Sequence, residues 1–125
     1  KVNVTVKVNG KTYKKTCTYT FVKYANPFKK LKIGKKNLAS YYAKEPEPSL
    51  YGVVSRLNGK LTYSLKAGYK VEKIEYSRFV SANNGSIKMY SIKKGQKLPK
   101  DFLALFIKLK NIKNNAYVSI RVDNN

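Results

Sequence analysis

Hydrophobic and polar residues alternate along most of the chain, beginning with its first eight residues. Valine occupies every second position over residues 2–8, while threonine, asparagine and lysine fill the positions between. A period of two is that of a β-strand with one buried face. The Asn9-Gly10 pair that follows is a strong turn signal. We therefore predict a hairpin whose return strand runs from Lys11 to about Tyr24.

A second hairpin is predicted around Asn58-Gly59. Residues 50–57 and 60–65 would form its two strands, and apolar residues alternate with hydroxyl-bearing residues along the second of them. A short apolar run at 31–33 and another at 87–91 predict two further strands of the same kind.

The strand that begins at Tyr69 changes phase along its length. Tyr69 and Val71 follow one alternation, whereas Ile74 and Tyr76 follow the other. An extra residue in one strand of an antiparallel pair produces such a shift. We therefore predict a β-bulge near Glu72-Lys73.

The most apolar segment, residues 102–110, fits both a helix and a strand. Phe102, Leu105, Phe106 and Leu109 have helical spacing, but every neighbouring element is predicted as a strand. Residues 117–122 alternate strictly and follow after a short polar loop. We therefore favour a central strand over 102–110 that pairs with 117–122.

Residues 37–48 form the least regular segment. Asn37 could cap one helical turn over residues 38–43, and Pro46 and Pro48 then enforce an extended chain. The adjacent pair Tyr41-Tyr42 lies in this segment. Exposed aromatic rings near basic residues can stack on bases or on sugar rings, so we name Tyr41 and Tyr42 as candidate ligand contacts. Ordinary packing of the segment against the core is the alternative that we favour.

These elements together predict an all-β fold. Short strands recur at intervals of roughly 8 to 15 residues and are joined mostly by tight turns, which is typical of an antiparallel sandwich rather than of βαβ units. We predict a single immunoglobulin-like β-sandwich domain over residues 1–125, with about 7–9 strands. Its core should contain Val4, Val6, Phe21, Leu61, Leu65, Leu105, Ile107, Val118 and Ile120.

The charge of the chain is strongly basic. Lys and Arg number 27 against 6 Asp and Glu, which gives a formal net charge of +21, yet only three of the basic residues are arginine. Specific recognition of phosphates and bases relies on the guanidinium group of arginine. Lysine also shares AT-rich codons with asparagine, isoleucine and tyrosine, so an AT-rich genome is the simplest cause of the excess. We expect salt-dependent attraction to anionic polymers and no specific nucleic acid.

The reactive side chains predict a protein that is not an enzyme and has no cofactor or metal. The chain has no histidine and one cysteine, Cys17, which excludes histidine-based triads, imidazole and multi-thiolate metal sites, and an internal disulfide. No glycine-rich nucleotide loop is present. The longest apolar run, Phe102–Ile107, is much shorter than the ~20 residues of a membrane-spanning helix, so we expect no transmembrane segment.

One covalent hypothesis deserves a test. Some surface sandwiches of Gram-positive bacteria link a lysine amine to an asparagine amide, with a buried carboxylate promoting the transfer. Lys15 interrupts an apolar strand face, and Glu72 and Glu75 are the strand-borne acids. The alternative, which we favour, is a solvated lysine and two carboxylates in surface ion pairs.

The layout resembles the bacterial immunoglobulin-like modules of secreted and cell-surface proteins in low-GC Gram-positive bacteria. The resemblance lies in residues 58–65 (NGKLTYSL), in 67–71 (AGYKV) and in the closing 118–122 (VSIRV). It implies a β-sandwich with a structural, adhesive or ligand-presenting role and transfers no catalytic residue. The chain differs from antibody-type domains because it has no tryptophan and no second cysteine.

Three functions follow as hypotheses. The first is a non-enzymatic module, extracellular or at the cell surface, with a structural, adhesive or ligand-binding role and anionic wall polymers or polysaccharide as partners. Because the chain opens without methionine or a signal-peptide core, we interpret it as a mature product or as one of several neighbouring modules. The alternatives are a basic nucleic-acid-binding β-barrel and a carbohydrate-binding β-sandwich. Lysines gathered on one face among exposed aromatic rings would favour the nucleic-acid binder.

Overall fold

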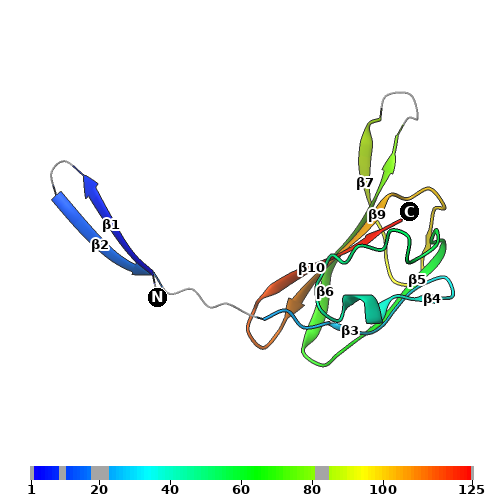
Figure 1. The fold of residues 1–125 in the computed structure, drawn as a ribbon, viewed down its shortest axis with the longest axis horizontal. Coiled ribbons are helices and arrows are strands. Elements are labelled where there is room, and N and C mark those ends of the chain that lie inside the picture. Colours follow the sequence, from blue (N-terminus) through cyan, green and yellow to red (C-terminus); the bar gives the residue numbers. More distant parts are fainter. Residues whose placement is uncertain (1, 9–10, 18–22, 81–84, 125) are drawn as a thin grey trace.

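The computed structural model describes the backbone of residues 2–8, 11–17, 23–80 and 85–124, and the side chains of 23–80 and 85–124. The described chain is almost entirely β-structure and contains one short 3-10 helix, η1 (Figure 1). In chain order its elements are β1 (Val2–Val8), β2 (Lys11–Cys17), β3 (Phe28–Ile33), β4 (Lys36–Asn37), η1 (Ala39–Tyr42), β5 (Gly59–Leu65), β6 (Tyr69–Phe79), β7 (Ile87–Ser91), β8 (Lys97–Leu98), β9 (Ala104–Asn111) and β10 (Tyr117–Asp123).

Two four-stranded antiparallel sheets form a β-sandwich, which confirms the prediction of an all-β antiparallel sandwich. The larger sheet has the strand order β10-β9-β6-β7, and the smaller sheet has the order β4-β3-β5-β8. Strands β9 and β10 pair from Tyr117 opposite Lys110 to Asp123 opposite Ala104. The pairing predicted between these two segments is therefore confirmed.

The N-terminal hairpin forms a third, two-stranded sheet. Strands β1 and β2 pair from Val2 opposite Cys17 to Val8 opposite Lys11, which confirms the hairpin. The return strand was predicted to reach Tyr24, but β2 ends at Cys17 and residues 23–27 form no strand. Figure 1 shows this hairpin apart from the two larger sheets. The turn residues Asn9-Gly10 lie outside the described residues, and the side chains of Val4, Val6 and Phe21 lie outside the described side chains.

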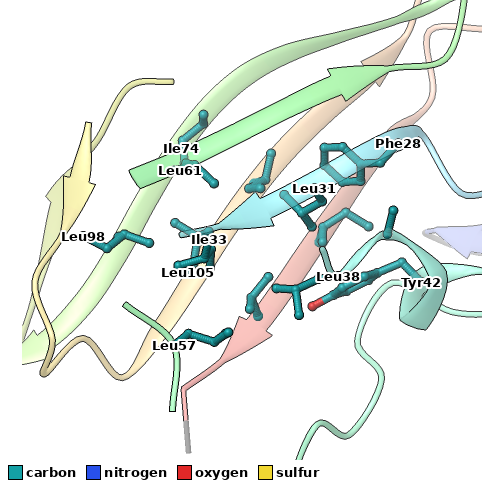
Figure 2. Packing of buried hydrophobic residues seen from close by; sticks show 14 of the residues in the cluster. Phe28, Leu31, Ile33, Leu38, Tyr42, Leu57, Leu61, Ile74, Leu98 and Leu105 are labelled. Carbon is teal, nitrogen blue, oxygen red and sulfur yellow. The ribbon is translucent and has the colours of Figure 1, made fainter. Parts of the chain in front are cut away.

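One hydrophobic core joins the larger and the smaller sheet (Figure 2). Of the predicted core residues, Leu61, Leu105, Ile107 and Ile120 are fully buried, which confirms these four. Leu65 and Val118 are only partly buried and pack against the edge of the cluster. The larger sheet supplies Ile74, Leu105, Ile107, Leu109, Ile120 and Val122, and the smaller sheet supplies Phe28, Leu31, Ile33, Leu61 and Leu98.

The apolar segment 102–110 contains a strand rather than a helix, although the strand begins at Ala104 and not at Phe102. In β9 the buried residues Leu105, Ile107 and Leu109 alternate with Phe106 and Lys108, which face the other side of the sheet. The strand pairs with β10 on one side and with β6 on the other, so it is central. Hydrogen bonding to two partners and burial of every second residue explain why the strand forms despite the helical spacing.

The bulge predicted near Glu72-Lys73 is present. Val71 pairs with Leu109 and Lys73 pairs with Lys108, which leaves Glu72 as the extra residue of β6. The change of phase in the sequence therefore reports a real irregularity in the ladder.

The hairpin predicted around Asn58-Gly59 is wrong. Residues 50–57 form turns and irregular chain, and β5 pairs with β3 and β8 instead. The amides of Val53 and Val54 both donate to the carbonyl of Leu50, which makes a compact turn that buries Leu50, Val54 and Leu57. Burial of one face of a turn thus explains the apolar positions that we took for strand alternation.

Gly59 was predicted to form a hairpin turn, but in the structure it lies at a close contact between two backbone segments. Its φ is +120°, and a Cβ atom at this position would lie 2.6 Å from the Cα of Gly34. The two glycines allow the backbones of the β3–β4 turn and of β5 to touch, and the amide of Gly34 donates to the carbonyl of Lys60. The glycine therefore permits a close backbone approach.

The helical turn predicted after Asn37 is confirmed as the 3-10 helix η1. The side-chain oxygen of Asn37 accepts a hydrogen bond from the amide of Ala39 at 3.1 Å. Ala39 and Tyr42 of this turn are buried against the sandwich, together with Leu38 before it. The segment 38–57 thereby closes one side of the core (Figure 2).

Candidate functional site

The two tyrosines proposed as ligand contacts differ in their surroundings. Tyr42 is fully buried, so its ring offers no face to a ligand, and for this residue packing against the core is the correct interpretation. Its hydroxyl donates to the backbone carbonyl of Arg121 at 2.7 Å. Burial, reinforced by the charge of Asp123, raises the pKa of Tyr42 above its ordinary value. Tyr41 is half-buried, and the Nζ atom of Lys36 lies 5.8 Å from the centre of its ring.

A small hollow lies beside this segment, where three other tyrosines meet. Tyr24, Tyr69 and Tyr117 line it together with Pro46 and Val118, and its volume is about 220 Å³. Burial, together with neighbouring Tyr69, raises the pKa of Tyr24 to about 12, and its hydroxyl donates to the carbonyl of Tyr42 at 2.7 Å. The hollow is smaller than the roughly 300–1,000 Å³ usual for a drug-sized ligand, so it suits a single ring or a short side chain.

Sequence reasoning did not find this hollow. Tyr24, Tyr69 and Tyr117 come from three distant segments, and only the pairing of β6 with β9 and of β9 with β10 brings the last two together. Tyr69 lies opposite Asn111 and Tyr117 opposite Lys110, which are neighbours on β9. Each tyrosine alone looked like an ordinary residue at the edge of a strand.

Lysines line the outer face of the smaller sheet. On β3, Lys30 lies opposite Ser64 and Lys32 opposite Thr62, while Lys60 of β5 lies opposite Lys97 of β8. Because neighbours in a strand point to opposite sides, these residues project away from the buried Leu31, Ile33 and Leu61. We call Lys30, Lys32, Lys60 and Lys97 the lysine face.

The strands of the lysine face carry no acidic residue. The sequences of β3, β4, β5 and β8 contain only lysine as a charged residue. Among the described residues, the four ion pairs involve Lys70, Lys73, Arg78 and Arg121 and none of the lysine face. The face therefore presents positive charge with hydroxyl groups beside it, which is an arrangement suited to anions.

On the outer face of the larger sheet, acidic residues of the same strands neutralise part of the positive charge. Lys73 Nζ lies 2.8 Å from Glu75 Oε1, and Arg121 Nε lies 2.8 Å from Asp123 Oδ1. Lys108 and Lys110 have no such acid but lie over the ring of Tyr117, at 4.7 and 5.7 Å from its centre. Lysines therefore occupy the outer faces of both sheets, a distribution that counts against a dedicated nucleic-acid surface.

The hypothesis of a lysine–asparagine crosslink is wrong for Glu72 and Glu75, because neither acid is in the environment that it requires. Glu72 and Glu75 belong to the outer side of β6 and pair with Lys70 and Lys73, at 3.3 and 2.8 Å. A carboxylate that promotes amide transfer has to be buried, whereas these two side chains are partly exposed in surface ion pairs. The interpretation as surface ion pairs is therefore correct for both, and the side chain of Lys15 lies outside the described side chains.

Within the described residues, no group of three His, Cys, Asp or Glu side chains could hold a metal ion. None of the helices in the described part of the chain is long and apolar enough to cross a membrane. No protein-family model, curated protein or solved structure matches the chain.

Proposed function

We propose that the chain is a non-enzymatic, immunoglobulin-like module, extracellular or at the cell surface, that binds anionic polymers through the lysine face. The observation that carries this proposal is the group Lys30, Lys32, Lys60 and Lys97 on strands without acids. Anionic wall polymers and acidic polysaccharides are the class of partner that this chemistry fits.

The geometry of a β-sheet makes the lysine face suitable for a linear polyanion. Neighbouring strands lie about 4.8 Å apart, and alternate residues such as Lys30 and Lys32 lie roughly 6.7 Å apart along a strand. The lysine side chains therefore leave the smaller sheet at intervals of roughly 5 to 7 Å. Lysine binds phosphate or carboxylate charges as a flexible point charge and without fixed geometry. The expected recognition is of charge density and depends on salt.

Four substitutions test the role of the lysine face. Lys30→Gln, Lys32→Gln, Lys60→Gln and Lys97→Gln combined should weaken binding of inorganic polyphosphate by about tenfold or more at low salt and lower the salt slope by about 3–4. A matched variant carries Lys44→Gln, Lys93→Gln, Lys100→Gln and Lys113→Gln, which are exposed lysines elsewhere on the chain. It has the same net charge and should bind almost as the original chain does. Equal losses in both variants would show that net charge alone attracts the polymer.

A second candidate function is carbohydrate binding in the tyrosine-lined hollow. The observation that favours it is the hollow of about 220 Å³ that Tyr24, Tyr69 and Tyr117 line. Aromatic rings with polar edges suit the apolar face of a sugar. Chemical-shift titration with neutral oligosaccharides would test it: shifts at Tyr69 and Tyr117 that Tyr117→Ala abolishes would support it, and unchanged spectra would reject it.

A further inference from the structure

The far end of the β6–β7 hairpin extends beyond the rest of the larger sheet. Strand β9 begins at Ala104, which lies opposite Ser77 of β6. Beyond this point Arg78 pairs only with Lys88 and Phe79 only with Ile87, and the amide of Val80 donates to the carbonyl of Ser86. Figure 1 shows this part of β6 and β7 standing out past β9.

Apolar side chains are concentrated on this projecting part. Phe79, Val80, Ile87 and Met89 are between 43% and 58% exposed, and they make up four of the eight large hydrophobic residues exposed in the described chain. Phe79 lies directly opposite Ile87, and Met89 follows two residues later on the same side of the hairpin. We call these four residues the hairpin tip. Exposed apolar groups that cluster in this way mark an interaction surface.

The strands of the hairpin tip carry two basic residues, of which Arg78 is paired with Asp101 at 2.8 Å, so Lys88 supplies the positive charge there. Over residues 78–80 and 85–91 the charged side chains are Arg78 and Lys88, which lie opposite each other. Lys88 Nζ lies 5.6 Å from the centre of the Tyr90 ring, and this ring stacks on Tyr76 with 5.4 Å between the centres. By the register of the pairing, Lys88 and Tyr90 lie on one face of the hairpin, and Phe79, Ile87 and Met89 lie on the other. The hairpin is therefore amphipathic across its two faces, which is an arrangement suited to a membrane interface.

We propose that the hairpin tip inserts into the headgroup region of an anionic lipid bilayer. The hairpin would lie along the interface with the face that carries Phe79, Ile87 and Met89 toward the boundary of the acyl chains, and Lys88 on the other face would remain among the lipid phosphates. The net charge of +21 attracts the whole chain to an anionic surface. The same charge opposes a second copy of the chain as the occupant, because two chains of this net charge repel each other.

A tryptophan reporter tests insertion directly. The chain contains no tryptophan, so Phe79→Trp creates a single fluorophore in the tip. With vesicles of phosphatidylcholine and phosphatidylglycerol, its emission should shift to the blue and become protected from quenching by iodide. Ile112→Trp, at an exposed apolar position on another loop, should show neither change. An unshifted Phe79→Trp spectrum with bound vesicles would overturn the proposal.

A partition measurement tests whether apolar contacts contribute. Phe79→Ser with Ile87→Ser should lower the partition coefficient on these vesicles by about tenfold, because the variant removes apolar area without changing charge. Val53→Ser with Ile112→Ser is the matched control, since both residues are similarly exposed, and it should partition within about twofold of the original chain.

Two results would contradict the proposal. Equal partitioning of both double variants would mean that charge alone holds the chain at the membrane. A concentration-dependent dimer in light scattering, abolished by Phe79→Ser with Ile87→Ser, would assign the tip to a second copy instead. Both tip residues are exposed, and circular dichroism of each variant verifies that the sandwich has formed.

Discussion

Tyr42 connects three parts of the chain that are distant in sequence. Its hydroxyl donates to the carbonyl of Arg121, its own carbonyl accepts from the hydroxyl of Tyr24, and its ring lies in the core. The residue therefore links η1 to β10 and to the chain before β3. A tyrosine that looked like a candidate ligand contact in the sequence is a structural anchor.

Tyr42→Phe should lower the free energy of unfolding by about 1–3 kcal/mol, because it leaves the carbonyl of Arg121 without its partner. Urea unfolding measures this change. Tyr41→Phe is the matched control on the adjacent residue and should change the stability by less than about 0.5 kcal/mol. An unchanged free energy of unfolding in Tyr42→Phe would mean that a water molecule replaces the hydroxyl as the partner of the Arg121 carbonyl.

Alkaline pH should destabilise the fold through the buried tyrosines. Burial raises the pKa of Tyr24 from 10.0 to about 12, so the folded state keeps a proton that the unfolded state loses. The resulting stability is present below pH 10 and is lost as the pH rises toward 12. Tyr24→Phe should reduce this loss, as measured by urea unfolding between pH 9 and about 12. An identical pH dependence in the original chain and the variant would contradict the argument.

Leu105→Ala should cost about 2–5 kcal/mol, because Leu105 is fully buried between the sheets and the change leaves a cavity. Leu65→Ala, at a partly buried position on the edge of the core, should cost less. The difference between the two in urea unfolding tests which side of β9 faces the core, and a cost below about 1 kcal/mol for Leu105→Ala would contradict that orientation.

At the level of elements, alternation predicted most strands and missed the segment 50–57. Where one face of a strand is buried, as in β9 and β10, the sequence shows the period of two directly. In residues 50–57 a turn buries Leu50, Val54 and Leu57 without strand pairing, and apolar positions alone do not distinguish the two cases. Asn58-Gly59 then looked like a hairpin turn, although the glycine serves a close contact with Gly34.

The bulge in β6 allows a test by deletion. Deleting Glu72 removes the unpaired residue and leaves Val71 facing inward and Lys73 facing outward, as their partners Leu109 and Lys108 require. The protein should remain folded, with a loss of stability on the order of 1 kcal/mol.

Deletion of Glu75 is the matched control, since both glutamates form a surface ion pair with a lysine. Restoring the register after this deletion would place Lys73 opposite Ile107 in the core or turn the following residues to the wrong face. This variant should lose cooperative thermal unfolding in circular dichroism. Similar stabilities for the two deletions would show that the register of β6 is not fixed by its buried face.

At the level of the molecule, the sequence predicted the fold class but neither the hollow nor the hairpin tip. Hydrophobic alternation depends on neighbours along the chain and is therefore visible in the sequence. The hollow needs the pairing of β6, β9 and β10, and the exposure of Phe79 and Ile87 needs the point at which β9 begins. Such features depend on which strands become neighbours, and alternation alone does not specify that.

The net charge of +21 predicts that salt stabilises the folded chain. Only four ion pairs occur among the described side chains, so repulsion between lysines dominates the electrostatics of the compact state. Raising sodium chloride from about 0.01 to 0.15 M shortens the screening length from ~30 to ~8 Å and should raise the midpoint of thermal unfolding. A midpoint that falls over this range in calorimetry would mean that attractive pairs dominate instead.

The closure of the core by residues 38–57 also affects how the protein is made. The hydroxyl of Tyr42 bonds to Arg121, 79 residues later, and the amide of Leu57 bonds to the side chain of Asn124, 67 residues later. During synthesis on a ribosome these partners emerge long after residues 38–57, so Leu38, Tyr42 and Leu50 stay without part of their packing in the growing chain. Such a chain exposes apolar surface for as long as translation of β10 takes, and it is in this interval that a chaperone would find its binding site.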